Sequence, residues 1–387
     1  MPAFEPTVYA ERRRVLGERM REQGVDVLFC PPSGDLEYLT GARRRIPTFG
    51  NISYTHGWVC GAFFRPEQDP VFVLPRMVAE FDMPEGVPGE KVVVKETDDG
   101  AAAFERVVAG LGPIGTLAVE PRTWAQTVLA LGRAGAGSVV DGTSLTNPMR
   151  RIKTPAEIER MAAACRLADK AMGAVTDDVA DGVLERELVE EVDSLLHGDG
   201  SRGVSFDTAI WAMGPGVARD ASDRETSSRM NAGSGVSFDF GAIIDGYCSD
   251  FGRTVAIGDA SDEYERVYQT VIAAQAAGLA AVRPGALACE VDAACRQVVV
   301  DAGYGDWFRH RTGHCIGLDV HEYPFISEED RTPLEAGMTF TIEPSVFWPG
   351  RVGVRIEDIV LVTDDGGMRL NEYANDMVVV DGPGGSR

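Results

Sequence analysis

The chain has 387 residues, of which 44% are hydrophobic and 25% are charged, a composition typical of a soluble globular protein with two or three domains. Its formal net charge of -23 argues against a nucleic-acid partner, which needs clustered lysine and arginine, and favours the attraction of cations. No apolar run could span a bilayer, and residues 1–20 lack the apolar core of a signal peptide, so we expect a cytoplasmic protein with no membrane contact.

The first half of the chain alternates helix-like and strand-like segments. Residues 11–24 and 101–112 have apolar side chains at helical spacing. Short apolar strands are predicted over residues 25–30, 69–75, 90–96 and 115–120. This alternation indicates an α/β layer domain, which we assign to residues 1–150.

A second domain is predicted from residue 151 to residue 387. Thr154, Pro155 and Glu157 form a capping box with proline at the first helical position, which starts a helix that runs to about Met172. Further helices are predicted over residues 183–198, 261–282 and 287–303. Strands are predicted over residues 338–347, 352–363 and 373–381. The mixture predicts an α+β domain around one curved antiparallel sheet.

Residues 237–254, SFDFGAIIDGYCSDFGRT, place two aspartates on the arms of one predicted hairpin. Asp245 and Gly246 are a strong turn signal, and Asp239 and Asp250 lie on either side of it among aromatic and β-branched residues. Two inward-pointing carboxylates repel each other and lose hydration unless a cation compensates them. The natural compensator is a metal ion.

Three further residues extend this candidate site. Glu343 and Glu357 are each embedded in an apolar strand, and His314 lies in the segment HRTGHCIGLDVHEYP. Four embedded carboxylates and one imidazole are hard to explain by pairing with arginine, but they suit two divalent ions. Oxygen-rich ligation favours Mn²⁺, with Co²⁺, Fe²⁺ or Zn²⁺ as alternatives. Such a pair of ions would activate a shared water and polarise a substrate carbonyl.

Four segments, DFGAIIDGYCSDFGRT, HRTGHCIGLDVHEYP, TIEPSVF and VRIEDIVLV, closely resemble the pita-bread metallohydrolases, which include prolidase, aminopeptidase P and methionine aminopeptidase. The spacing of the five candidate ligands is similar to that of microbial prolidases. SGDLEYLTGARRR and KTPAEIERMAAACRLADKAM resemble the creatinase-type N-terminal domain and the first catalytic helix, so the resemblance covers the whole chain. It implies a pita-bread catalytic domain at residues 151–387, with the ligands on a six-stranded curved sheet, preceded by an α/β creatinase-type domain at residues 1–150.

The resemblance also implies roles for individual residues. The implied metal ligands are Asp239, Asp250, His314, Glu343 and Glu357. Asp239 and Asp250 would bind one ion, with Asp250 bridging. His314 and Glu343 would complete the other site, and Glu357 would bridge both. Glu343 would also act as general base and pass the proton to the leaving nitrogen. His321 would bind the substrate and stabilise the oxyanion.

Other residues are candidates for supporting roles. Arg355 precedes Glu357 by two residues, so on a strand it shares that face and could brace a metal carboxylate. His310 is assigned either a structural role or a place near the substrate. His56 could reach the active site of a neighbouring subunit in the homodimer that the resemblance implies, or it could simply be packed.

One segment departs from the family pattern. Family peptidases carry a further histidine upstream of the hairpin, and residues 211–228, WAMGPGVARDASDRETSS, have none. The charged residues found there are Arg219, Asp220, Asp223, Arg224 and Glu225. The family's EPG is EPS here, with Ser345. Arg219 could replace the histidine, the charged loop could recognise a different small substrate, or the charges could be solvated.

These observations predict a hydrolase that cleaves a C–N bond, the imido bond of an Xaa-Pro peptide, by a metal-activated hydroxide. The missing histidine leaves an alternative, an enzyme of the same fold acting on a non-peptide small molecule, as a small-amide hydrolase or a sulfonio-propionate lyase. A third interpretation is a binding protein that kept the fold and lost catalysis. The complete ligand set argues against it.

Overall fold

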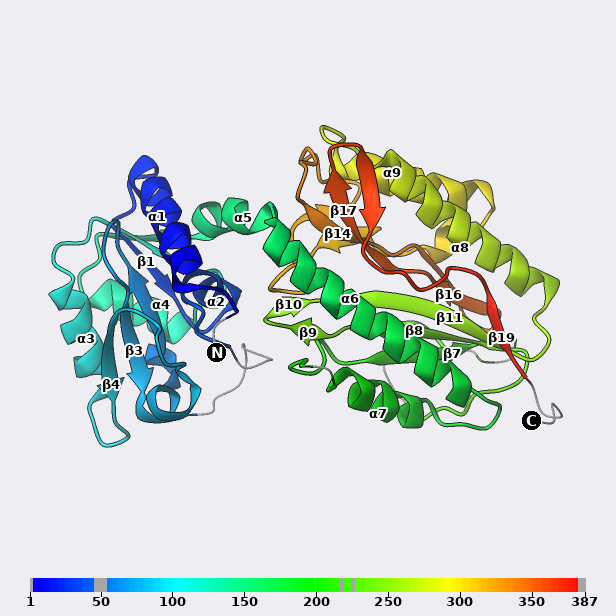
Figure 1. Cartoon of the computed structure of the whole chain (residues 1–387), viewed down its shortest axis with the longest axis horizontal. Helices are drawn as coiled ribbons and strands as arrows, with labels where there is room; N and C mark the ends of the chain where they lie inside the picture. Colours follow the sequence, from blue (N-terminus) through cyan, green and yellow to red (C-terminus); the bar gives the residue numbers. More distant parts are fainter. Residues whose placement is uncertain are drawn as a thin grey trace. The chain divides into compact units, whose positions relative to one another are not determined.

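The computed structural model describes residues 3–44, 54–198, 200–215, 217, 219–223 and 227–381. The chain divides into two compact units, residues 1–150 and 151–387 (Figure 1). Within the described ranges, no helix combines the length and the apolar character that a membrane span requires.

The first unit contains a six-stranded mixed sheet in the order β4-β3-β2-β1-β5-β6. Its strands are β1 (Val27–Cys30), β2 (Gly61–Phe64), β3 (Val71–Pro75), β4 (Glu90–Val94), β5 (Thr116–Val119) and β6 (Ser138–Asp141). Its helices are α1 (Pro6–Glu22), α2 (Gly34–Thr40), α3 (Gly100–Gly110), α4 (Ala125–Arg133) and α5 (Thr143–Arg151), with the single turns η1 (Gly57–Val59) and η2 (Val78–Asp82). Each strand predicted in this half is present, and the core forms where Phe29 and Phe63 of the sheet meet Phe104 of α3.

The second unit begins with the helix that the capping box predicts. Thr154 caps α6, and Glu157 reaches back to the Thr154 amide at 2.8 Å. The helices of this unit are α6 (Pro155–Val175), α7 (Glu185–Leu196), α8 (Asp262–Ala281) and α9 (Ala288–Asp301), with the turns η3 (Thr176–Asp178) and η4 (Gly305–Trp307).

The strands of the second unit form two larger sheets and two short pairs. They are β7 (Ala209–Met213), β8 (Gly235–Phe240), β9 (Ile243–Ile244), β10 (Tyr247–Cys248), β11 (Phe251–Ile257), β12 (Gly313–Cys315), β13 (Glu322–Ile326), β14 (Thr339–Ile342), β15 (Ser345–Trp348), β16 (Val352–Arg355), β17 (Asp358–Thr363), β18 (Gly366–Arg369) and β19 (Val378–Val380). The sheet orders are β19-β11-β8-β7 and β13-β12-β14-β17-β18, and the pairs are β9-β10 and β15-β16.

This arrangement differs in detail from the single six-stranded sheet that the resemblance implied. The segment predicted as one strand over residues 338–347 is interrupted after Ile342, because Pro344 has no amide hydrogen to continue a ladder. The two larger sheets are joined where Gly252 and Glu357 exchange backbone hydrogen bonds of 3.3 and 2.9 Å. The joint brings residues of both sheets together.

Helices cover the outer faces of these sheets and leave the inner faces for polar side chains. Phe238, Phe240 and Phe251 pack in one core with α6 and α7, and a second core joins α8 and α9 to β14, β16 and β17. Because side chains alternate along a strand, Asp239 points away from the helices on which its neighbours Phe238 and Phe240 pack.

Candidate metal centre and its pocket

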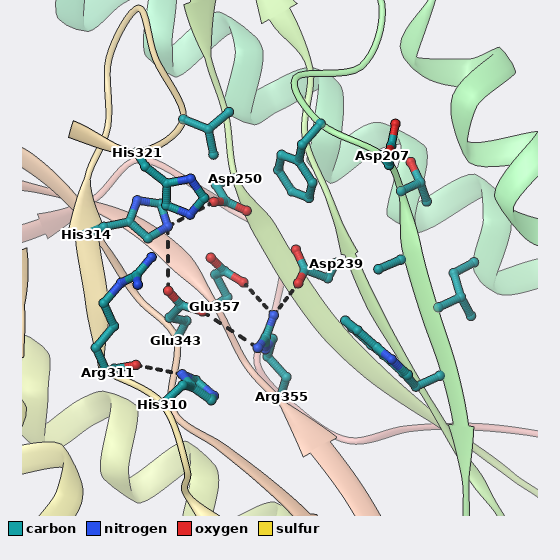
Figure 2. Close-up of a pocket in the computed structure, with 16 residues that line it drawn as sticks. Asp207, Asp239, Asp250, His310, Arg311, His314, His321, Glu343, Arg355 and Glu357 are labelled. Carbon is teal, nitrogen blue, oxygen red and sulfur yellow. Dashed lines mark hydrogen bonds and ion pairs between the residues drawn. The ribbon is translucent and has the colours of Figure 1, made fainter. Parts of the chain in front are cut away.

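A cavity of about 630 Å³ lies in the second unit, and acidic side chains from separate strands line it (Figure 2). The five residues that the resemblance implied as metal ligands all contribute to its wall: Asp239, Asp250, His314, Glu343 and Glu357. They are nearly buried, with exposed fractions between 1% and 8%. The fold therefore gathers residues spread over more than a hundred positions of sequence.

The hairpin places its two aspartates as the turn signal predicts. Asp245 and Gly246 have φ of 51° and 92°, the left-handed backbone of a type I′ turn, between the short strands β9 and β10. Farther out, Asp239 of β8 lies opposite Gly252 of β11. Asp250 lies two residues before Gly252, so its side chain is on the same face.

The remaining three residues approach from the second sheet. His314 of β12 places Nε2 3.3 Å from Oδ2 of Asp250 and 3.6 Å from Oε1 of Glu343. Glu343 follows β14, and Glu357 lies between β16 and β17, so both glutamates occupy interruptions in the ladder. Backbone that leaves the regular strand can turn each carboxylate into the cavity.

The electrostatics of the cluster reflect an excess of negative charge. Burial raises the pKa of Glu343, although Arg355 and His314 oppose the shift. Burial, followed by repulsion from Asp250 and Glu343, raises the pKa of Glu357 well above its usual range. Burial alone would lower the pKa of His314, but the hydrogen bond to Asp250 and the charge of Glu343 raise it. Ionised carboxylates at this density require additional positive charge.

The donor atoms fit divalent ions. One ligand atom each from Asp250, His314 and Glu357 can lie within 4.8 Å of one another. Oε2 of Glu357 is buried and has no hydrogen-bond partner among the described residues. A buried carboxylate oxygen without a donor is costly, and a cation would satisfy it. Carboxylate oxygens with one imidazole are suitable ligands for Mn²⁺ and similar metals.

Arg355 is the guanidinium nearest this cluster. Its Nη1 contacts Oδ2 of Asp239 and lies 3.9 Å from Oε2 of Glu357, and its Nη2 lies 3.8 Å from Oε2 of Glu343. Its carbon Cζ lies 5.7 Å from the centre of the Trp211 ring. The side chain thus lies where a brace for the acidic residues was predicted.

Two further predicted histidines, His310 and His321, also line the cavity. His321 is exposed, and its ring centroid is 4.2 Å from that of His314. His310 bonds the Arg311 carbonyl through Nδ1 at 2.6 Å and the Ser345 hydroxyl through Nε2 at 2.5 Å. Burial, assisted by the charge of Arg355, lowers the pKa of His310 to about 3, so its ring is neutral.

Three predicted substrate contacts have other surroundings. The guanidinium of Arg219 pairs with buried Glu185 of α7 and does not line the cavity. Asp220 pairs with Arg309 at 2.8 Å. His56 lies in the first unit with its ring against Gly100. Their contacts with substrate remain predictions. Arg224 and Glu225, also named in that loop, lie outside the described residues.

The cavity has further lining residues that the sequence did not identify as functional. They include Phe206, Asp207, Trp211, Arg311 and Val320. Arg311 directly follows His310 in the HRTGH segment. Its position next to a candidate site residue could have identified it as a candidate for the same site. Phe206 and Trp211 belong to an apolar stretch that reads simply as a strand, and no local pattern distinguishes them from core residues.

Comparisons with known proteins cover the same two units. Residues 159–364 match the model of Metallopeptidase family M24, and residues 12–152 match the Creatinase/Prolidase N-terminal domain. The chain is 32% identical over 369 residues to the putative dipeptidase YkvY of Bacillus subtilis, covering 93% of this chain and 97% of the relative. It is 29% identical to the Xaa-Pro dipeptidase of Pyrococcus horikoshii, covering 95% and 99%. The crystal structure of recombinant prolidase from Thermococcus sibiricus has a TM-score of 0.87 at 28% identity, covering 96% and 99%.

Proposed function

Because this chain belongs to metallopeptidase family M24 and is therefore a metal-dependent hydrolase, we propose that it cleaves the imido bond of short Xaa-Pro peptides. The observation that carries the proposal is that one cavity gathers Asp239, Asp250, Glu343 and Glu357 with His314. The full-length similarity to an Xaa-Pro dipeptidase supports the choice of substrate.

The proposed metal ligands are the five residues of this cluster. Asp239 and Asp250 would hold one ion, His314 and Glu343 the other, and Asp250 and Glu357 would be shared. Oε2 of Glu357 is buried, accepts no hydrogen bond from the described residues and lies 3.9 Å from the nearest nitrogen of Arg355, which supports its assignment as a ligand. Two bound divalent ions would supply a water that ionises near neutral pH and would polarise the scissile carbonyl.

The chain's own side chains would orient the substrate and move the proton. Glu343 would take the proton of the attacking water at a carboxylate oxygen and deliver it to the imido nitrogen as the C–N bond breaks. His321, which is exposed in the cavity beside His314, would donate a hydrogen bond to the oxygen that gains negative charge. Arg355 would hold the Asp239 and Glu343 carboxylates in position.

We further propose that residues 151–387 form the catalytic domain and residues 1–150 a creatinase-type domain that accompanies it. Mn²⁺ as the native metal, a homodimeric assembly and a cytoplasmic location remain predictions. Metal reconstitution, sedimentation analysis and fractionation of the host cell would test them in turn.

The proposed function is tested by reloading chelator-treated protein with Mn²⁺ and measuring hydrolysis of Xaa-Pro dipeptides and tripeptides. We expect turnover only after metal is restored. Matching peptides with alanine in place of proline are the control, and they should be cleaved more slowly. A protein that binds two metal equivalents and cleaves none of these peptides would refute the peptide substrate. It would redirect the search to small amides and sulfonium compounds.

A further inference from the structure

The cavity contains a second guanidinium, that of Arg311, which forms no ion pair or hydrogen bond with the proposed metal ligands. Arg311 lies on the loop between α9 and β12 and contributes to the cavity wall. We propose that Arg311 binds the C-terminal carboxylate of a dipeptide substrate and thereby favours dipeptides over longer peptides. This inference rests on the proposed function, because it assigns a specificity residue to the same cavity.

The two cavity arginines differ in their partners. Arg355 lies against Asp239 and within 4 Å of both Glu343 and Glu357. The guanidinium of Arg311 forms no ion pair and no hydrogen bond with any described residue, and its Nε is buried without an acceptor. Its two Nη groups are not buried and bond to no described residue, so they are the donors that an anionic ligand in the cavity can reach.

The position of Arg311 is fixed from two sides. Its guanidinium carbon lies 4.7 Å above the centre of the Phe325 ring, a stacking contact that limits its rotation. Its carbonyl accepts the hydrogen bond from Nδ1 of His310, so Nε2 of that neutral ring accepts from the hydroxyl of Ser345. Ser345, the departure from the family's EPG pattern, therefore helps to anchor Arg311. A prepositioned guanidinium loses less entropy when it binds a carboxylate.

The charges along the cavity match the two ends of a dipeptide. Figure 2 shows Arg311 beside His314 and Glu343, while the carboxylate of Asp207 lies beyond Asp239 at the other end of the cluster. A dipeptide has an ammonium group on one side of its scissile bond and a carboxylate on the other. A longer peptide presents a neutral amide where the dipeptide presents its carboxylate. Arginine forms paired, charge-assisted hydrogen bonds with a carboxylate but not with an amide.

A different role for Arg311 predicts different kinetics. Its positive charge lowers the pKa of Glu343 and opposes protonation of His314, although it is only a minor contributor to each shift. If Arg311 acted through these residues alone, its loss would affect every substrate equally. If Arg311 instead binds the carboxylate, its loss affects only substrates whose C-terminal carboxylate directly follows proline, as in a dipeptide.

The test compares an Xaa-Pro dipeptide with its C-terminal amide and with the tripeptide Xaa-Pro-Gly. We expect Arg311→Met to raise KM for the dipeptide by roughly 10- to 100-fold and to change the values for the amide and the tripeptide by less than about twofold. Arg311→Lys should recover part of the loss, since lysine keeps the charge without the paired geometry. Exposed Arg331→Met is the matched control. Equal losses on dipeptide and amide would overturn the proposal.

A binding measurement separates this proposal from the proposed function. Calorimetry of metal-loaded protein should show that proline binds more tightly than prolinamide, and that Arg311→Met removes the difference. Thermal melting checks that the variant is folded. A protein that cleaves no peptide but binds proline through Arg311 would refute the proposed function and support the carboxylate site. Equal affinity of the unmodified protein for proline and prolinamide would refute the carboxylate site, whatever peptides it cleaves.

Discussion

Replacement of Arg219 by methionine distinguishes an anchor of the protein from a contact with substrate. Arg219 pairs with Glu185, which is 0% exposed at the start of α7 and also accepts a hydrogen bond of 2.7 Å from the backbone of Ala212 in β7. Removal of one partner from a buried ion pair leaves an uncompensated charge. We therefore expect Arg219→Met to lower the free energy of unfolding.

The magnitude follows from the titration of Glu185. Its pKa in the folded chain is already raised, chiefly by burial, above the ordinary value of 4.5, and loss of Arg219 raises it further. A raised carboxyl pKa contributes stability below pH 4.5 that is lost as the pH rises, so the deficit of the variant grows with pH. Keeping Glu185 protonated in the folded chain costs about 1.36 kcal/mol for each pH unit above its ordinary pKa of 4.5. This cost limits the electrostatic loss of the variant to about 3.4 kcal/mol at pH 7 and about 0.7 kcal/mol at pH 5.

Scanning calorimetry at pH 5 and pH 7 measures this difference. A loss of about 3 kcal/mol corresponds to a fall in Tm of roughly 6–12 °C for a unit of this size. Adding Glu185→Gln to the variant should recover part of the loss at pH 7, because no buried charge remains. Arg309→Met is the control: it breaks an exposed pair with Asp220 and should cost less than about 1 kcal/mol at either pH. An unchanged Tm with a raised KM would refute the anchoring role and favour contact with substrate.

Three further predictions concern the metal centre. Asp250→Ala should abolish hydrolysis while leaving a cooperative melting transition, and calorimetry together with a peptide assay checks both. Chelation should lower Tm more at pH 8 than at pH 5. The raised pKa values of Glu343 and Glu357 mean that these carboxyls destabilise the fold increasingly as the pH rises above about 4.5. A bound cation compensates their charge, so its removal matters most at high pH. Gly252→Ala should weaken metal binding roughly tenfold in a chelator competition, since its Cβ would lie 3.0 Å from Oε2 of Glu357; an unchanged affinity would place the ion elsewhere.

Local signals in the sequence predicted much of the fold. The capping box at Thr154 starts α6, and the turn signal at Asp245-Gly246 joins β9 and β10. The family and the fold class, which rested on the resemblance, are confirmed by the two family matches and by the similarity to solved prolidase structures. These features succeed because each depends on residues within a few positions of one another, or on motifs that retain their spacing.

Contacts between residues that are far apart in the sequence could not be predicted from local signals. Arg219 and Glu185 are 34 residues apart, and neither has a local pattern that identifies the other. The stacking of Arg311 on Phe325 likewise depends on how β12 and β13 pair. The interruption at Pro344 is a different case, because proline within a predicted strand is itself a signal for a break.

The charged loop that replaces the family's histidine acquires a specific interpretation from these contacts. Arg219 forms an ion pair with Glu185, and Asp220 forms one with Arg309, which immediately precedes His310. For Arg219 to take over the role of the histidine, it would have to leave a buried carboxylate, at a cost of up to about 3 kcal/mol at pH 7. The charges of Arg219 and Asp220 are therefore better explained as ion pairs that hold these two residues in place. Recognition of the substrate then depends on the groups that do line the cavity, with Trp211 on β7 and Arg311 before β12 as the ones to change first.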